Sequence, residues 1–151
     1  MPSVKVKVVN VKELQKALQK KSLRAIDSVE KAVNSGALAI HGTAIKLVQK
    51  GPRSGITYPR QKGSKTHTAS APGEPPKTDT GNLVSNIKLA VGKDGPMFVA
   101  RIIADTPYAK WLEFGTAQNG GPRPFMQPAF QKHERQIRKD IQFALNKGLG
   151  L

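Results

Sequence analysis

The sequence contains no cysteine in its 151 residues. A chain without thiols forms no disulfide, thiolate metal site or cysteine nucleophile, and its compartment stays undetermined on this ground. Long apolar runs are also missing. No window approaches the roughly 18 apolar residues of a transmembrane helix, and the first residues alternate valine and lysine, unlike a signal peptide. We therefore expect a protein that is made and used in the cytoplasm and does not contact a membrane.

Acidic residues are scarce. Ten aspartates and glutamates stand against 25 lysines and arginines, which gives a formal net charge of +15 at pH 7. A charge of this size creates a strong positive potential around a small monomer. It favours contact with nucleic acid or with an acidic protein surface; the alternative is a solvated basic surface that only keeps the monomer soluble. Charge bears on association and not on the fold, so both interpretations stay open here.

Only eight aromatic residues are present, and five of them lie between Pro107 and Gln131. Because aromatic side chains bury the largest areas, we expect this segment to hold the core or a docking surface. The spacing predicts a short helix from Pro107 that ends at Gly115, followed by a loop through 119–122. We expect the aromatic residues to form a junction between that helix, a sheet and the last helix: Tyr108, Trp111, Phe114, Phe125 and Phe130.

The length corresponds to one domain, residues 1–151, whose core needs no disulfide or metal. The alternation of valine and lysine predicts a strand over Ser3–Val9, and Asn10 can cap a helix that runs to Lys50. A continuous helix of this length would extend about 58 Å, so we expect it to pack over its length or to break, most readily at 34–36. Its small residues favour close packing, within the domain or between subunits: Ala32, Gly36, Ala37, Ala39, Gly42 and Ala44.

Residues 52–80, which we call the arm, differ from the rest in composition. They contain five prolines, three glycines, eight serines or threonines and five lysines or arginines, with almost no aliphatic side chain. Because such a segment buries too little apolar surface to fold alone, we expect it to be extended, mobile in the free subunit and ordered by a partner. The alternative is a plain linker that stays disordered. The candidate contacts are Arg53, Ile56, Tyr58, Arg60, Lys62 and Lys65.

The segments after the arm complete an α+β pattern. A short helix through Ser85 precedes two alternating segments, Ile87–Val91 and Phe98–Ala104, which predict a β-hairpin. The last helix opens at Arg123-Pro124 or at Gln127-Pro128 and ends at Lys147-Gly148. This order predicts a small, mainly antiparallel sheet packed by the long N-terminal helix, the short aromatic helix and the C-terminal helix, with the arm as a long proline-rich loop.

Residues that carry chemistry do not gather into a motif. The histidines stand far apart and none has a second ligand at metal-binding spacing, so we interpret His41, His67 and His133 as surface or packing residues. Glu113 and Asp105 are near each other in the sequence, but a carboxylate on a helix more often meets a lysine or caps a turn. No phosphate-binding glycine loop and no RNA-stacking motif is present. We predict no catalytic, cofactor-binding or metal-binding residue, and hence no enzyme.

Three segments in a fixed order carry a resemblance to a known family: SAPGEPPKTDTGNL over Ser70–Leu83, YAKWLEFGT over Tyr108–Thr116 and RPFMQPAF over Arg123–Phe130. With the preceding strand and long helix, the chain resembles the tail-component family of long-tailed double-stranded-DNA bacteriophages of the Hong Kong lambdoid type. This resemblance spans nearly the whole chain. The chain departs from the pattern in the insertion AQNGG between Thr116 and Pro122 and in the length of the arm.

The resemblance implies a structural virion protein of the phage neck. Such a protein forms a ring, of six subunits by the resemblance, that completes the tail or joins the head to the tail. Its implied partners are a head-completion protein, a tail terminator or the tail tube, with non-specific contact to genomic DNA. It would be made in the host cytoplasm and reside in the virion. Two other classes of protein stay open from the residues. One is a basic nucleic-acid-binding module, which the charge supports although the chain lacks a helix-turn-helix signature and zinc ligands. The other is a phage-encoded hydrolase.

Overall fold

A computed structural model describes residues 11–60, 65–95, 97–117 and 120–150, with side chains from residue 16 onward. The mixed α+β class is confirmed, whereas the strand predicted over Ser3–Val9 lies outside the described residues. The elements are α1 Val11–Lys50, β1 Thr57–Pro59, β2 Thr66–Thr68, α2 Asn82–Ser85, β3 Ile87–Asp94, β4 Met97–Ala104, α3 Ala109–Phe114 and α4 Met126–Leu149.

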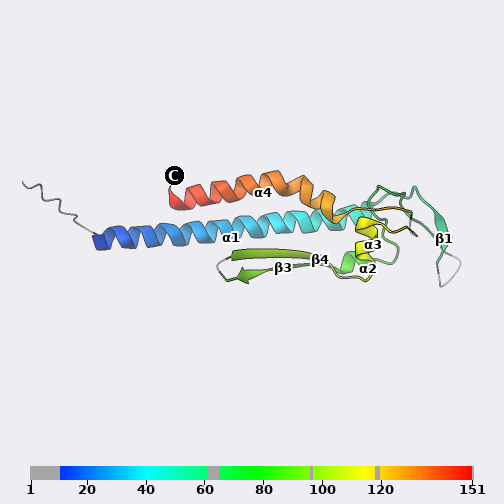
Figure 1. The fold of residues 1–151 in the computed structure, drawn as a ribbon, viewed down its shortest axis with the longest axis horizontal. Helices are drawn as coiled ribbons and strands as arrows, with labels where there is room; N and C mark the ends of the chain where they lie inside the picture. The colour runs from blue at the N-terminus through cyan, green and yellow to red at the C-terminus, as the bar shows by residue number, and fades with distance from the viewer. Residues whose placement is uncertain (1–10, 61–64, 96, 118–119, 151) are drawn as a thin grey trace, which may run out of the picture.

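The long helix α1 is the central element, and the other long elements lie along it (Figure 1). α4 runs antiparallel to α1 on one side, and the hairpin β3–β4 lies along the opposite side. α2, α3 and the arm gather at the C-terminal end of α1. The described strands form two separate antiparallel pairs, β1–β2 and β3–β4. The subunit is therefore elongated, with its long axis along α1.

α1 continues without a break through residues 34–36, the place where the sequence would most readily allow one. Gly36 is buried, and a Cβ atom at this position would lie 2.7 Å from Cγ1 of Ile137 in α4. The glycine therefore allows α4 to approach closely and does not interrupt the helix. Packing against α4 offsets the low helix propensity of glycine, so of the two alternatives the helix packs here and does not break.

α4 has Pro128 in its first turn, as predicted, but it does not end at Lys147-Gly148. Gly148 is buried inside the helix, where a Cβ atom would lie 2.2 Å from Cα of Ala25 in α1. The helix ends at Leu149, and Gly150 caps it in the left-handed conformation with φ 74°. The predicted end was wrong because Gly148 serves the contact between the helices, while Gly150 serves the cap.

We expect Gly148→Ala to lower the free energy of unfolding by about 1–3 kcal/mol, because the new methyl group meets the backbone of α1. Gly42→Ala is the matched control. Gly42 also lies inside a helix, but a Cβ atom there meets nothing within 4 Å. That substitution should stabilise the protein by about 0.5–1 kcal/mol through helix propensity. Urea unfolding of both variants measures the two effects, and a Gly148→Ala protein as stable as Gly42→Ala would contradict the close contact.

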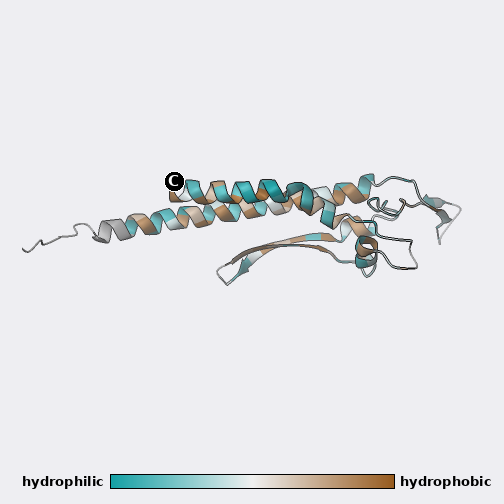
Figure 2. Ribbon diagram, turned by 45° about the horizontal axis from the view of Figure 1, so that its top comes forward, coloured by the Kyte–Doolittle hydropathy of each residue, from teal (hydrophilic) through white to brown (hydrophobic). Residues whose placement is uncertain are grey.

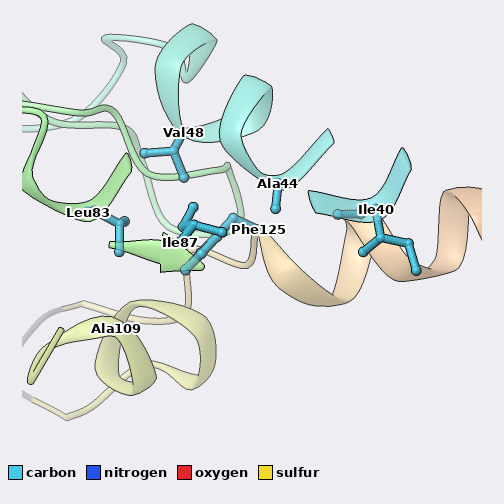
Figure 3. Packing of buried hydrophobic residues seen from close by; sticks show 8 residues of the cluster. Ile40, Ala44, Val48, Leu83, Ile87, Ala109 and Phe125 are labelled. Carbon is cyan, nitrogen blue, oxygen red and sulfur yellow. The ribbon is translucent and has the colours of Figure 1, made fainter. Parts of the chain in front are cut away.

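The main core forms where α1, β3, α3 and the start of α4 converge (Figure 3). Phe125, directly before α4, is fully buried there, as are Ala44 and Val48 of α1. Away from this cluster, the residues buried between α1 and α4 are small, and examples are Ala25, Gly36 and Ala144. The close helix packing predicted from the small residues of α1 is therefore present within the subunit. The other buried members of the cluster are Ile40, Leu83, Ile87, Ala109 and Ala129.

The predicted hairpin is confirmed, with both strands extending further toward the turn than the alternation indicated. β3 and β4 pair in continuous antiparallel register from Ile87↔Ala104 to Asp94↔Met97. The base of the hairpin packs on the core through Ile87 and Ala104. Near the tip, the Lys93 ammonium lies 3.8 Å from the Glu30 carboxylate of α1. The hairpin is thus anchored at its base and joined to α1 near its tip.

The described part of the arm contains two short strands, so a long loop without secondary structure is not confirmed, and its mobility in the free subunit stays a prediction. β1 and β2 pair antiparallel within it. Main-chain hydrogen bonds extend this pairing: the Gly55 amide donates to the Ala69 carbonyl at 2.8 Å, and the Ala69 amide donates to the Ile56 carbonyl at 3.0 Å. The Thr78 amide donates to the Val48 carbonyl of α1 at 3.1 Å. Aliphatic content did not reveal this structure, because backbone hydrogen bonds hold it together.

The expected aromatic junction forms only in part. Phe125 is fully buried and Tyr108 packs against the core. The other three aromatic residues are largely exposed: Trp111 at 49%, Phe130 at 48% and Phe114 at 78%. α3 has only six residues, so one side of it contacts the core and the opposite side, which carries Trp111 and Phe114 three residues apart, turns away. The prediction that Phe114 shares the buried junction is therefore wrong, whereas for the half-exposed Trp111 it stays a prediction.

Candidate interaction surfaces

Large apolar side chains are frequent on the surface of the described residues. Isolated exposed apolar residues are ordinary, but clusters of them mark interaction sites. Here they fall mainly on three parts of the subunit. These are the N-terminal half of α1 (Leu18, Leu23, Ile26), the hairpin β3–β4 (Val91, Met97, Ile103), and the arm with α3 (Ile56, Tyr58, Trp111, Phe114).

The N-terminal part of α1 is exposed because α4 does not reach it. Gly148 of α4 contacts Ala25, and a Cβ atom on Gly150 would lie 3.3 Å from Nζ of Lys21. α4 therefore ends beside this stretch of α1, and residues 16–24 are all exposed. Leu18 lies seven residues, or about two helical turns, before Ala25, so it continues the side of α1 that α4 covers further along.

A polar cluster holds the β1–β2 hairpin against the end of the arm. The Arg60 guanidinium forms an ion pair with the Asp79 carboxylate, and Nη2 of Arg60 donates to the Asp79 carbonyl at 3.1 Å. His67 is buried, with Nδ1 3.3 Å from the same carboxylate. The rings of His67 and Tyr58 lie 5.4 Å apart. Partial burial, with the negative charge of Asp79, raises the pKa of the Tyr58 hydroxyl above its ordinary value.

The six residues of the arm that were predicted to contact a partner differ in their exposure and pairing. Ile56 and Tyr58 are 78% and 43% exposed. Arg53 and Lys65 are exposed as well. The Arg60 charge is instead paired inside the arm, so Arg60 has an internal structural role that the sequence did not show. Lys62 lies outside the described residues. Contact of these side chains with a partner stays a prediction.

A cavity of about 650 Å³ opens between the arm, α2 and α3. Its walls combine apolar side chains, such as Leu83 and Leu112, with polar groups, and Nδ2 of Asn82 donates to the Tyr108 hydroxyl at 3.0 Å at its edge. Ser70 is fully buried in the lining, and no hydrogen-bond partner of its hydroxyl is described. A hollow of this size and character suits an apolar side chain or a short peptide segment of a partner.

Glu113 forms the cap of α4, which the sequence did not identify. Its carboxylate accepts hydrogen bonds from three backbone amides at the start of α4, those of Phe125 at 2.9 Å, Met126 at 3.0 Å and Gln127 at 2.8 Å. The negative charge also lies at the positive end of the helix dipole. The carboxylate that resembled a possible acid in the sequence therefore joins α3 to α4.

The three histidines make internal contacts. Nε2 of His41 lies 2.8 Å from the Ile87 carbonyl oxygen, and Nε2 of His133 lies 2.7 Å from Oγ1 of Thr43. His41 links α1 to β3, and His133 links α4 to α1, which agrees with the interpretation of both as packing residues. In the described part of the chain, no three His, Asp or Glu side chains gather as a metal-ion site requires. Neither does any helix within these ranges have the apolar length needed to span a bilayer.

These features are typical of an assembly subunit: an elongated helical body, apolar side chains exposed at both ends, and a few ionisable groups, such as Glu113 and Asp79, that hold elements together. Residues 12–115 match the family model described as "Bacteriophage HK97-gp10, putative tail-component". The match covers α1, the arm, α2, β3–β4 and α3, and ends before α4. Three segments carried the resemblance, and one of them, Arg123–Phe130, therefore lies outside the matched residues. No curated protein and no solved structure matches the chain.

The match covers more than half of the chain, and the protein belongs to this family of bacteriophage tail components. Membership supports a structural role in the phage tail and a place in the virion, and it implies contact with other tail or head proteins. It also agrees with a protein that is not an enzyme.

Proposed function

We propose that the protein is a component of the phage neck, which completes the tail or joins the head to the tail. It forms a ring, six-membered as the resemblance implies, between the head-completion proteins and the tail terminator or tail tube. The observation that carries the proposal is that exposed apolar side chains lie at both ends of the subunit. Leu18, Leu23 and Ile26 lie toward one end, whereas Ile56 and Phe114 lie at the other. A protein that joins two structures needs such surfaces at both ends.

The net charge of +15 sets the conditions under which the subunits associate. Like charges oppose self-association most strongly at low ionic strength, where screening is weak. We therefore expect the purified protein to be a monomer or a loose oligomer at low salt, with the closed ring forming only against its neck partners. Mass measurement at low and at physiological salt checks this, and electron microscopy of assembled necks gives the subunit number. A stable closed ring at low salt would contradict the prediction.

The same charge supports the second candidate function, a basic nucleic-acid-binding module. A titration of duplex DNA at increasing salt separates the two. Tight binding with a steep salt slope favours the DNA module, because each neutralised phosphate releases counterions. Weak binding, together with incorporation of the protein into necks, favours the structural component.

We expect Ile56→Ser to reduce incorporation into necks while leaving stability unchanged. Ile56 is 78% exposed, so its truncation should change the free energy of unfolding by less than about 0.5 kcal/mol. Leu38→Ser is the matched control, since Leu38 is a 60% exposed aliphatic residue on α1, away from the arm. Thermal unfolding and the amount of protein in purified particles are the two measurements. Equal incorporation of both variants would contradict a role of the arm as a docking surface.

A further inference from the structure

We infer that the hairpin β3–β4 joins one copy of this chain to the next: β4 of one subunit pairs antiparallel with β3 of its neighbour, so that the hairpins form a continuous intersubunit sheet. The inference rests on the proposed ring and names the surface that joins its subunits. Three observations carry it: the open edges of the hairpin, the apolar character of β4, and the low net charge of this region.

The first observation concerns the edges. In the described part of the chain β3 and β4 pair only with each other, so each strand has one unpaired edge of eight residues. An unpaired edge presents a row of backbone donors and acceptors to another strand. Proteins commonly protect such edges with proline, with a bulge or with lysine. Neither proline nor a bulge occurs within these strands, whose register runs without interruption from Ile87↔Ala104 to Asp94↔Met97. Lysine occurs in β3 but not in β4.

The second observation concerns the side chains. β4 reads MFVARIIA and has a single charged residue, Arg101. Met97 and Ile103 lie on the same face of the strand and are 59% and 49% exposed. A long apolar strand at an open edge is prone to pair with another chain. An isolated two-stranded hairpin is also marginal, whereas three or more strands with an apolar face are stable. In Figure 2 the hairpin lies on the side of α1 opposite α4, so the helices leave its outer face uncovered.

The third observation identifies the partner as a second copy of the chain. From Ile87 to Asp105 there are three basic and two acidic residues, a net charge of +1 in a protein of net charge +15. Each basic group already lies near a carboxylate: Lys88 is 2.7 Å from Asp105, Lys93 is 3.8 Å from Glu30, and Arg101 is 3.3 Å from Asp94. An acidic protein or DNA would gain little electrostatic attraction here, whereas an identical hairpin can approach without strong repulsion.

The choice of β3 as the partner of β4 follows from the two edges. If β4 paired with β4 of a second copy, the contact would be two-fold and would leave both β3 edges open. Pairing of β4 with β3 occupies every edge when the ring closes. The strands then alternate in direction around the ring, as antiparallel pairing requires. The same arrangement propagates from each subunit to the next.

The natural chain has no cysteine, so single introduced cysteines report contacts between subunits without interference. One set carries a cysteine on the outer face of β3 (Lys88→Cys, Ala90→Cys), and the other carries one on the outer face of β4 (Val99→Cys, Ile103→Cys). Proteins from the two sets, of different mass through a tag, are mixed at about 1 M salt, where the Debye length is only about 3 Å. We expect mixed β3–β4 disulfides for at least one pair of positions. The exposed control Gln131→Cys on α4 should give none with either set.

Cross-links only between two β4 cysteines would overturn the inference in favour of a two-fold contact. The absence of any cross-link above the Gln131→Cys control, in the mixed proteins and in assembled necks alike, would overturn it altogether. A charge substitution gives an independent readout. Ile103→Lys should reduce cross-linking between Ala90→Cys and Val99→Cys by about tenfold or more, because it would bury a charged group in place of an apolar side chain in the joint. The matched control Phe143→Lys adds the same charge to an exposed site on α4 and should reduce it little. An equal effect of both substitutions would refute the hairpin as the joint.

These outcomes separate the inference from the proposed function. Rings in the assembled neck without β3–β4 cross-links would place the joint elsewhere and leave the neck function standing. Absence of the protein from the neck would instead remove the proposed function, whatever the cysteines show.

Discussion

Phe125→Ala should remove about 3–5 kcal/mol from the free energy of unfolding, the largest loss that we expect from a single substitution. The ring is fully buried at the point where α1, β3, α3 and α4 meet, so its removal leaves a cavity that rigid helices cannot close. Domains of this size are stable by only about 5–15 kcal/mol. The unfolding temperature should fall by roughly 6–20 °C, as measured by circular dichroism or calorimetry.

Phe114→Ala is the matched control for Phe125→Ala. It deletes the same ring from a site that is 78% exposed, and it should change the free energy of unfolding by no more than about 0.5 kcal/mol. Trp111→Ala should fall between the two, since that side chain is 49% exposed. Similar losses in Phe114→Ala and Phe125→Ala would show that the core lies elsewhere than in Figure 3.

Glu113→Ala should destabilise the protein by about 2–4 kcal/mol. The substitution removes three charge-assisted hydrogen bonds to the first amides of α4 and a negative charge at the helix N-terminus. Glu113→Gln keeps one acceptor oxygen without the charge, so it should lose a smaller part of this free energy. Urea unfolding of the three proteins measures the series.

The control for Glu113→Ala must remove the same charge, because any loss of an acidic residue raises the net charge of a basic protein. Glu134→Ala does so on α4, where Glu134 forms only a surface pair with Arg138 at 2.8 Å. A pair of this kind contributes about 0.3–0.5 kcal/mol. If the two variants were equally stable, the Glu113 carboxylate would not be capping α4.

The elements that sequence periodicity revealed are those in which local pattern and tertiary packing agree. Alternation predicted the hairpin after Ile87, and the three-to-four spacing predicted α1 and α4, because each presents one apolar side to its neighbours. Sequence periodicity could not show whether α1 breaks at Gly36. The residue that makes this glycine favourable, Ile137, is about a hundred positions away in the sequence.

The arm and the cap of α4 were hidden for different reasons. Composition counts aliphatic side chains, whereas the arm is held by main-chain hydrogen bonds and by Arg60, His67 and Asp79, none of which has a periodic signature. For the cap, one sequence signal existed. α4 begins after Phe125, which provides no side-chain hydrogen bond, so a helix of 24 residues started without a local capping group. An acceptor from another segment was needed, and Glu113 provides it.

In the proposed neck ring, the uninterrupted α1 would act as a fixed spacer. Because the helix rises about 1.5 Å per residue, its 40 residues span about 60 Å whatever the loops do. Residues 16–20 lie beyond the end of α4, so the length of α1 can change there without disturbing the contact between the helices. Seven added residues would lengthen the rod by about 10 Å and return its side chains to nearly the same direction, whereas one would turn everything before it by about 100°. The distance between the surfaces at the two ends of α1 would therefore vary in steps of whole helical repeats.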